Sequence, residues 1–141
     1  GGKTDIVMML NGALAGLVAI TAEPLTPGPI TAMFIGSIGA IIMYFGTKML
    51  ESYGLDDVVG AIPVHMFAGI FGTLVVPLTN SDTSFGTQFI GTASVCIFSF
   101  GLSWITFTLL KSTIGLRISK AAEKLGTDKA EVGVTAYSIR D

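Results

Sequence analysis

Apolar residues in this chain fall into four long runs that are separated by short polar segments. The runs cover residues 6–22, 30–50, 58–78 and 85–116, and the segments between them contain the Pro, Gly, Asn and Ser residues that are typical of turns. A helix needs about 20 predominantly apolar residues to cross a bilayer, so the pattern predicts about four transmembrane helices. The first run is short unless residues 3–5 extend it, and the last requires a tilted helix or one that continues into the cytoplasm.

The composition agrees with a membrane protein. Hydrophobic residues make up 50% of the 141 residues, charged residues only 13%, and the mean hydropathy is +0.72. A soluble domain would carry about twice that share of charge. We therefore predict an all-α fold, a polytopic membrane helix bundle. The net charge of -2 gives no indication of a nucleic-acid partner, and a single cysteine, Cys96, excludes a disulfide framework.

The basic residues predict the orientation in the membrane. Four crossings would place residues 1–5, 51–57 and those after 116 on one side, and segments 23–29 and 79–84 on the other. The second side carries no Lys or Arg, so the positive-inside rule makes the first side cytoplasmic. This predicts a membrane region over residues 1–116 and a cytoplasmic tail over residues 117–141. The basic residues on the first side, or at helix ends facing it, are Lys3, Lys48, Lys111, Arg117, Lys120, Lys124, Lys129 and Arg140.

The only histidine, His65, lies several residues inside the third apolar run. An ionisable side chain at that depth is costly and usually faces the protein interior or a water-filled path. Two interpretations follow. His65 either packs between helices with its ring N–H on a backbone carbonyl, or lines a conduction path or binding site. We favour the second interpretation.

Two aspartates and a proline precede this histidine. Asp56 and Asp57 stand at the expected start of the third helix, where carboxylates accept hydrogen bonds from free backbone N–H groups and suit the positive end of the helix dipole. Capping explains both aspartates, and a role at a cytoplasmic vestibule is the alternative. With a helix that begins at either aspartate, Pro63 would follow the first turn and bend the helix.

Small residues recur at the spacing of helix-packing contacts. Lipid supplies no hydrophobic drive between helices, so close approach over small residues holds a membrane bundle together. We favour this packing role over the alternative that the small residues shape a narrow pore. Asn11 lies within the first run and is expected to bond to another helix or to face a pore. The small pairs are Gly12 and Gly16, Gly36 and Ala40, and Gly69 and Gly72.

The tail after residue 116 alternates positive and negative charge. Ser119, followed by Glu123 and Lys124, predicts one short helix that is broken at Gly126. One interpretation of the tail is a solvated and partly disordered end. The alternative, which Gly126, Gly133 and Tyr137 indicate, is a defined path across a surface.

No catalytic or cofactor site can be assembled from the residues of this chain. It contains one histidine, one cysteine and no cluster of carboxylates inside the apolar runs. A metal site or a nucleophile–base pair needs such groups together. We therefore predict that the protein is not an enzyme and that it uses no cofactor or metal.

Several stretches together resemble the C-terminal part of the ammonium transporter (Amt/Mep/Rh) family, and the resemblance covers nearly the whole chain. It implies that the four runs are the last four helices of an eleven-helix protomer. It also implies that the chain is a fragment of an integral membrane protein that assembles as a homotrimer with one pore in each protomer. The stretches are residues 10–21 (LNGALAGLVAIT), 56–65 (DDVVGAIPVH), 69–74 (GIFGTL) and the tail pattern Gly126-x-Asp128-x-x-Glu131-x-Gly133-x-x-Ala136-Tyr137.

The resemblance further implies a mechanism and roles for individual residues. Ammonium loses its proton outside the membrane and crosses a narrow hydrophobic pore as ammonia, past two facing imidazoles along which the proton returns. His65 matches the second of these histidines, Ala61 shares its pore-facing side one turn earlier, and Thr21 is a further pore residue. A PII-type regulator is implied at the cytoplasmic tail. The residues of this regulatory tail are Arg117, Gly126, Asp128, Glu131, Gly133 and Tyr137.

The sequence departs from the family pattern in three places. The helix with the first pore histidine is absent, so this chain alone cannot form the family's pore. Gly60 stands where many bacterial members carry an acidic residue, and Val132 and Val134 replace polar residues of the tail. Two other functions stay open: an ammonium sensor that signals through its tail, and a structural membrane piece that folds only with the missing half.

Overall fold

The computed structural model describes residues 2–136, and within that range it contains helices and no β-strand. This confirms the prediction of an all-α fold. The chain divides into two compact units, Gly1–Cys96 and Ile97–Asp141, with the boundary inside helix α4. The helical elements in chain order are α1 (Ile6–Ile20), α2 (Pro29–Ser52), η1 (Ile62–Phe67), α3 (Ala68–Val75), η2 (Val76–Leu78), α4 (Phe85–Thr113), α5 (Lys120–Leu125) and η3 (Asp128–Val132).

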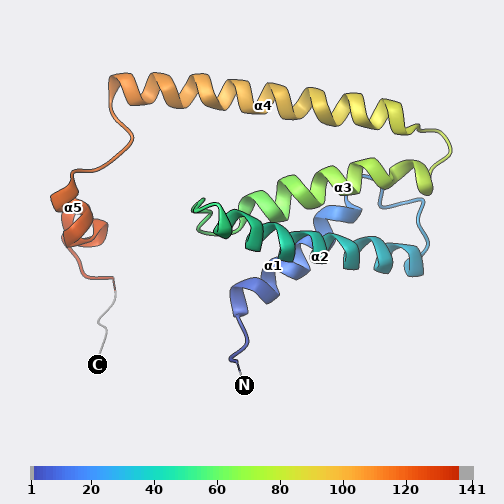
Figure 1. Cartoon of the computed structure of the whole chain (residues 1–141), viewed down its shortest axis with the longest axis horizontal. Helices are drawn as coiled ribbons and strands as arrows, with labels where there is room; N and C mark the ends of the chain where they lie inside the picture. Colours follow the sequence, from blue (N-terminus) through green and yellow to red (C-terminus); the bar gives the residue numbers. More distant parts are fainter. Residues whose placement is uncertain (1, 137–141) are drawn as a thin grey trace. The chain divides into compact units, whose positions relative to one another are not determined.

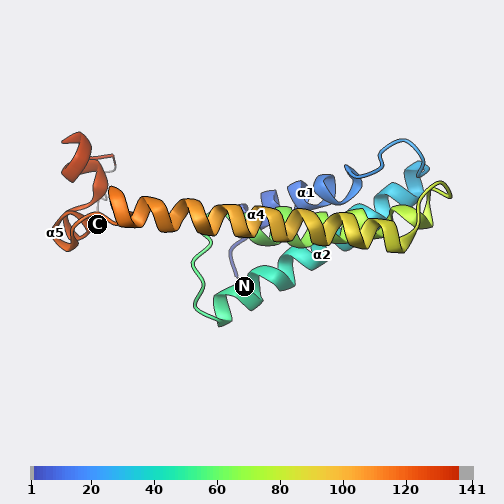
Figure 2. The same ribbon diagram turned by 90° about the horizontal axis from the view of Figure 1, so that it is seen from above.

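The first unit is built on three packed helical segments: α1, α2 and the continuous η1–α3–η2 segment (Figure 1; Figure 2). Its core is small because each segment buries only one narrow stripe. The buried hydrophobic cluster consists of Ala15 from α1, Met43 from α2, Val64 from η1 and Ala68 from α3. Small side chains at the crossings let the helix backbones approach closely, as membrane packing requires.

The predicted packing over small residues is confirmed for Gly16 and Gly36, where α1 crosses α2. A β-carbon on Gly16 would lie 3.1 Å from the Gly36 carbonyl oxygen. That distance is tight for a carbon–oxygen contact, so a side chain on Gly16 would require the α2 backbone to shift by a few tenths of an ångström, whereas a β-carbon on Gly36 would lie at an ordinary 3.4 Å from the Gly16 carbonyl oxygen. Gly12, the other member of the predicted pair, is less tightly packed, since its β-carbon would lie 3.7 Å from Met43 Cε.

Two close crossings involve Ala19 of α1, which touches both other segments. A β-carbon on Gly39 of α2 would lie 2.6 Å from Ala19 Cβ, and one on Gly72 of α3 would collide with the Ala19 carbonyl oxygen. Ala19 therefore lies where α1, α2 and α3 meet. The sequence spacing indicated Gly72 as a packing residue but gave no indication of Gly39.

In the part of the chain that the structure describes, two helices, α2 and α4, are long and apolar enough to cross a membrane. The other two predicted crossings correspond to shorter apolar helices, Ile6–Ile20 and Ile62–Leu78. The first run is not extended over residues 3–5, because Asp5 caps the helix: its side chain accepts a hydrogen bond of 3.0 Å from the Met8 N–H. The third helix begins at Ile62 and not at residue 58. These boundaries correct the predicted ones.

Helix α4 is continuous from Phe85 to Thr113 and buries none of its residues in the structure. It ends before the predicted boundary at residue 116, because Gly115 has a φ of +83°, a left-handed conformation that no helix accommodates. Three hydroxyl groups of this helix, those of Thr106, Ser112 and Thr113, donate to carbonyl groups of the preceding helical turn. Thr106 Oγ1, for example, donates to the Leu102 carbonyl at 2.8 Å.

The tail contains the predicted short helix. Helix α5 begins after Ser119, whose side chain accepts a hydrogen bond from the Ala122 N–H at 3.2 Å. It ends at Gly126, which has a φ of +95°. A second turn, η3, follows and ends at Gly133 with a φ of +74°. Both glycines lie in conformations that other residues rarely adopt, so they shape the path of the tail.

Candidate functional site

The segment that leads into η1 is held by one carboxylate. Asp57 Oδ1 accepts a hydrogen bond from the Ala61 N–H at 2.9 Å, and Oδ2 accepts one from the Ile62 N–H at 2.8 Å. These are free N–H groups of a helix start, which have no partner within the helix. The prediction that Asp57 caps this helix is therefore confirmed.

The prediction that both aspartates open the helix is wrong for Asp56. The helix begins at Ile62, so a turn of chain separates it from the aspartates, and only Asp57 reaches forward to the free N–H groups. Asp56 is exposed. Both aspartates line a recess of about 180 Å³, together with Glu51, Gly60 and Pro63. The recess lies at the helix end that the positive-inside rule predicts to be cytoplasmic.

We expected Pro63 to follow the first turn of the helix, but it lies within that turn. Proline is well tolerated there, because its missing N–H would have no partner within the helix. Its ring is buried against the unit. Pro63 therefore helps to begin η1 instead of bending an established helix.

Asn11 ties α1 to the segment before η1. Its Nδ2 donates to the Val59 carbonyl at 2.9 Å, so the expected partner in another element exists, but it is a loop carbonyl and not a helix side chain. The neighbouring Gly60 has a φ of +72°, and a β-carbon there would lie 2.5 Å from Asn11 Nδ2. Glycine at residue 60 therefore fits both the backbone conformation and the close approach of Asn11.

His65 lies on the outer side of the three-helix unit. Pro63, Val64 and Ala68 are buried, whereas His65 and Ala61 are exposed and fall one turn apart on the same side. His65 does not line the recess beside Asp56 and Asp57, nor the small cavity beside Ala19 and Gly72. Within residues 2–136, therefore, the His65 ring is not packed between the helices of this unit.

Thr21 is not brought next to His65. It forms the C-cap of α1, where its Oγ1 donates to the Val18 carbonyl at 2.7 Å. Ala19, two residues earlier, packs against Gly72, which follows His65 by seven residues of helix. At 1.5 Å per residue this separation amounts to about 10 Å along the helix axis. Thr21 and His65 thus lie at different levels of the unit.

The candidate regulatory residues of the tail form a local fold. Asp128 Oδ2 accepts a hydrogen bond from the Ala136 N–H at 2.8 Å, and this bond is the main cause that lowers the pKa of Asp128. Arg117 pairs with Glu123 at 3.5 Å on the surface. Glu131 is exposed, and Gly126 and Gly133 provide the turns described above. Tyr137 lies outside the described residues.

A contact between loops was not anticipated from the sequence. Asn80 Nδ2 donates to Glu23 Oε2 at 2.9 Å, and the Leu25 N–H donates to Glu23 Oε1 at 3.2 Å. These bonds, with that from Asn80 the largest cause, lower the pKa of Glu23. One feature of the sequence could have drawn attention to Glu23. It is the only charged residue in a connection that otherwise holds Pro, Gly, Thr and apolar residues.

We expect replacement of Asp57 by alanine to destabilise the protein by about 0.5–2 kcal/mol, the usual cost of losing an N-cap side chain. The reason is that the Ala61 and Ile62 N–H groups both lose their acceptor. Thermal unfolding of the purified protein in detergent measures the effect. Asp56→Ala is the matched control, because Asp56 is exposed and does not cap the helix. Equal melting temperatures for the two variants would contradict the assignment.

Comparison with known proteins identifies the family. Residues 1–137 match the model of the Ammonium Transporter Family. The chain is 38% identical to ammonium transporter Amt2 of Archaeoglobus fulgidus, with 96% of this chain and 33% of that protein covered. It is 34% identical to ammonium transporter Amt2 of Methanocaldococcus jannaschii (96% and 34% covered) and 31% identical to an ammonium transporter of Corynebacterium glutamicum (98% and 34% covered).

The chain therefore belongs to the ammonium transporter family, a family of membrane transporters and not of enzymes. It spans about a third of the length of these relatives. Membership agrees with the apolar helices α2 and α4, which have the length and composition of membrane-spanning segments. The chain is thus an integral membrane protein, as the hydrophobic pattern predicted.

Proposed function

We propose that this chain is the C-terminal part of an ammonium transporter, and that the complete protein conducts ammonia through a hydrophobic pore after ammonium has lost its proton outside. The observation that carries the proposal is the position of His65. The single histidine of a chain in this family lies at a helix start that is fixed by Asp57, on a side that the three-helix unit leaves uncovered.

The uncovered side of η1 supports a role for His65 as one wall of the pore. A ring that is not packed within its own unit can face a passage formed with the remaining part of the protein, which accounts for about two thirds of the length of the relatives. A neutral imidazole can donate a hydrogen bond from one nitrogen and accept one at the other. It can therefore hold ammonia or relay the proton, while Ala61, one turn earlier, keeps the passage narrow and apolar. Thr21 would contribute at a different level of the pore.

The recess lined by Asp56 and Asp57 supports a vestibule at the cytoplasmic mouth of this pore. Asp57 would serve two purposes there, because the carboxylate that lines the recess also holds the N–H groups that begin η1. Asn11 would hold α1 against the same turn through Val59. In this proposal Asp57 and Asn11 position the backbone that carries His65 and do not bind the transported molecule.

We also propose the membrane arrangement. Residues 1–116 would contribute the last four helices of an eleven-helix protomer, with residues 117–141 as a cytoplasmic tail. The absence of Lys and Arg from the connections 23–29 and 79–84 supports this orientation. The large apolar residues left exposed on α2, such as Met33, Phe34 and Phe45, support contact with lipid or with other helices of the protein. The complete protein would be a homotrimer.

The tail would bind a regulator of the PII type. The turns at Gly126 and Gly133, and the bond from the Ala136 N–H to Asp128, support a tail with a defined shape instead of a disordered end. Arg117, Glu131 and Tyr137 would complete the regulatory surface.

Deleting residues 117–141 from the complete transporter is expected to leave membrane insertion intact but to lower transport or its regulation at least about twofold. The physical reason is that the deleted segment begins after α4 and contributes no residue to the core of the first unit. Membrane fractionation and methylammonium uptake measure the two properties. Unchanged uptake together with unchanged regulator binding would contradict a regulatory tail.

Ammonium-dependent current, or uptake of methylammonium, by the complete protein in proteoliposomes tests the proposed function. A transporter gives substrate-dependent flux that saturates with concentration. A protein that binds ammonium and changes conformation without any flux would instead be a sensor, and that result would contradict the proposal.

A further inference from the structure

Two loops at one end of the three-helix unit are joined by a carboxylate and an amide. Glu23 lies in the loop between α1 and α2, and Asn80 lies in the segment between η2 and α4. Asn80 Nδ2 donates to Glu23 Oε2 at 2.9 Å, while Asn80 Oδ1 accepts a hydrogen bond from the Asp82 N–H at 2.9 Å. The second bond fixes the orientation of the amide, so that its NH₂ group is directed to Glu23.

The two loops meet at a second point as well. Thr26 Oγ1 lies 3.5 Å from Thr79 Oγ1, although these residues are separated by 53 positions in the sequence. The Leu25 N–H donates to Glu23 Oε1 at 3.2 Å, so the carboxylate also orders its own loop. Both oxygens of Glu23 are therefore engaged, and the bond to Asn80 is the one that connects the loops.

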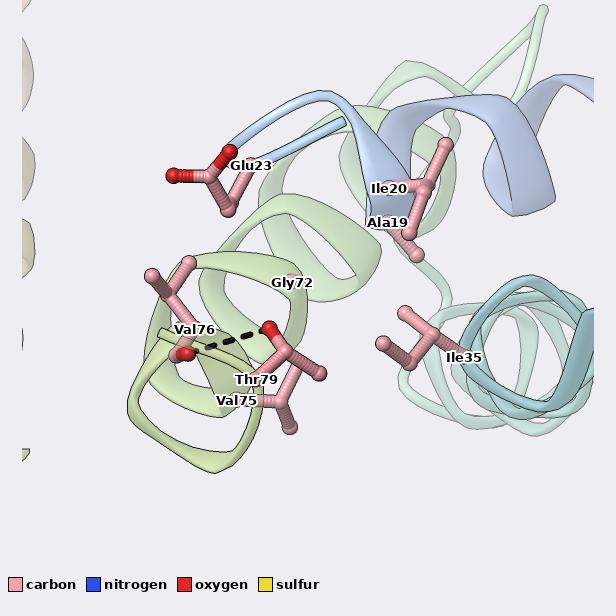
Figure 3. Close-up of a pocket in the computed structure, with 8 residues that line it drawn as sticks. All are labelled: Ala19, Ile20, Glu23, Ile35, Gly72, Val75, Val76 and Thr79. Atoms are coloured by element: carbon pink, nitrogen blue, oxygen red, sulfur yellow. Dashed lines mark hydrogen bonds between the residues drawn. The ribbon is translucent and has the colours of Figure 1, made fainter. Parts of the chain in front are cut away.

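The contact between the loops lies near a close helix crossing of the unit. A cavity of about 10 Å³, with room for roughly one water molecule, is lined by Ala19, Gly72 and Thr79 together with Glu23. Figure 3 shows that the Glu23 carboxylate is directed away from Ala19 and Ile35. The carboxylate therefore acts between the loops and does not fill the cavity, which also borders the crossing of α1 and α3 at Ala19 and Gly72.

No positive side chain competes for this carboxylate within the two loops. The segments 21–28 and 79–84 contain Glu23 and Asp82 as their titratable groups and no Lys, Arg or His. Helix α1 and the α3–η2 segment carry no titratable side chain in this region, and Lys48 and Glu51 of α2 lie near the opposite end of that helix. The state of the contact between the loops thus depends on the protonation of Glu23.

We propose that Glu23 and Asn80 form an acid-sensitive latch, which holds the loop after α1 against the loop before α4 and opens when Glu23 is protonated. An ionised carboxylate accepts a stronger, charge-assisted hydrogen bond than a neutral carboxyl group does. Because the pKa of Glu23 lies below its usual 4.5, the stabilisation is fully present above about pH 4.5 and is lost as the pH falls through the lowered pKa.

A disulfide between the loops tests the geometry of the latch. The full-length protein with Thr26→Cys and Thr79→Cys, in a Cys96→Ala background, is oxidised with copper phenanthroline at pH 7. We expect Glu23→Ala or Asn80→Ala to slow formation of the disulfide by roughly threefold or more, since the loss of a charge-assisted bond separates the loops. Asp82→Asn is the matched control and leaves the rate unchanged. Equal rates in Glu23→Ala and the control would overturn the latch.

Hydrogen exchange tests how the latch between Glu23 and Asn80 responds to acid. The Leu25 N–H donates to the Glu23 carboxylate, so its protection, corrected for the intrinsic effect of pH, reports whether that carboxylate stays an ordered acceptor. The Asp82 N–H donates to Asn80 Oδ1, so its protection reports whether the amide keeps the orientation that directs its NH₂ group to Glu23. We expect protection in the wild type to fall at least about threefold between pH 5 and pH 3. The isosteric Glu23→Gln variant keeps one of the two acceptor oxygens and cannot ionise, so its protection, whatever its level, should not change with pH. The same pH curve in both proteins would overturn the acid sensitivity.

Discussion

Replacing His65 with alanine in the complete transporter is expected to change methylammonium transport, or the selectivity between ammonia and ammonium, by roughly tenfold or more. A positioned imidazole that accepts and returns a proton contributes factors of about 10²–10⁴ in well-studied proton-transfer sites, so tenfold is a conservative expectation. Uptake and current measured in proteoliposomes give the two quantities. Assembly should be unaffected, because the His65 side chain is exposed and does not contribute to the buried cluster of the unit.

Met66→Ala provides the matched control for this experiment. Met66 follows His65 in the same turn and is 48% exposed. The Met66→Ala substitution therefore removes a side chain of similar length that cannot transfer protons. It should reduce transport far less than His65→Ala does. Wild-type transport and selectivity in the His65 variant, with normal expression, would refute the pore role of the histidine.

Replacing Gly72 with valine is expected to give the largest loss of stability of any substitution considered, about 2–4 kcal/mol. The new β-carbon would collide with the Ala19 carbonyl oxygen, which is backbone and cannot move without displacing α1. Since Ala19 also contacts Gly39, the displacement would disturb the junction of all three helices. Denaturant unfolding in detergent measures the loss.

Gly91→Val separates this steric effect from the general cost of valine in a helix. Gly91 lies in α4, and a β-carbon there would meet no atom within 4 Å. We expect this variant to change the free energy of unfolding by less than about 1 kcal/mol. Similar losses for the two variants would contradict the close approach of α1 and α3 at Gly72.

Much of the fold could be predicted from the hydrophobic pattern. The apolar runs gave the positions of the four long helical segments, because burial in lipid requires backbone hydrogen bonds within each segment. Helix ends were less predictable. The start of the third helix depends on Asp57 reaching forward to Ala61 and Ile62, and this geometry has no signature in the apolar pattern, which begins at residue 58.

The candidate site was predictable only in part. The rarity of an ionisable residue in an apolar run was enough to single out His65. Ala61 precedes His65 by four residues, which is one helical turn, and this spacing predicted that the two residues share a side. Both are exposed on one side of the helix. The pairing of Asn80 with Glu23 and the contact of Gly39 with Ala19 depend on how distant segments meet, and a single sequence gives no direct information on that.

The central claim is that the His65 imidazole faces a passage for ammonia in the complete protein. A structure of the full-length transporter in lipid nanodiscs, resolved well enough to place side chains and ordered solvent, tests it most directly. We predict a narrow apolar passage beside the His65 ring, bounded on the other side by residues outside this chain. A ring that contacts lipid acyl chains, or one that is sealed among side chains with no passage beside it, would contradict the account.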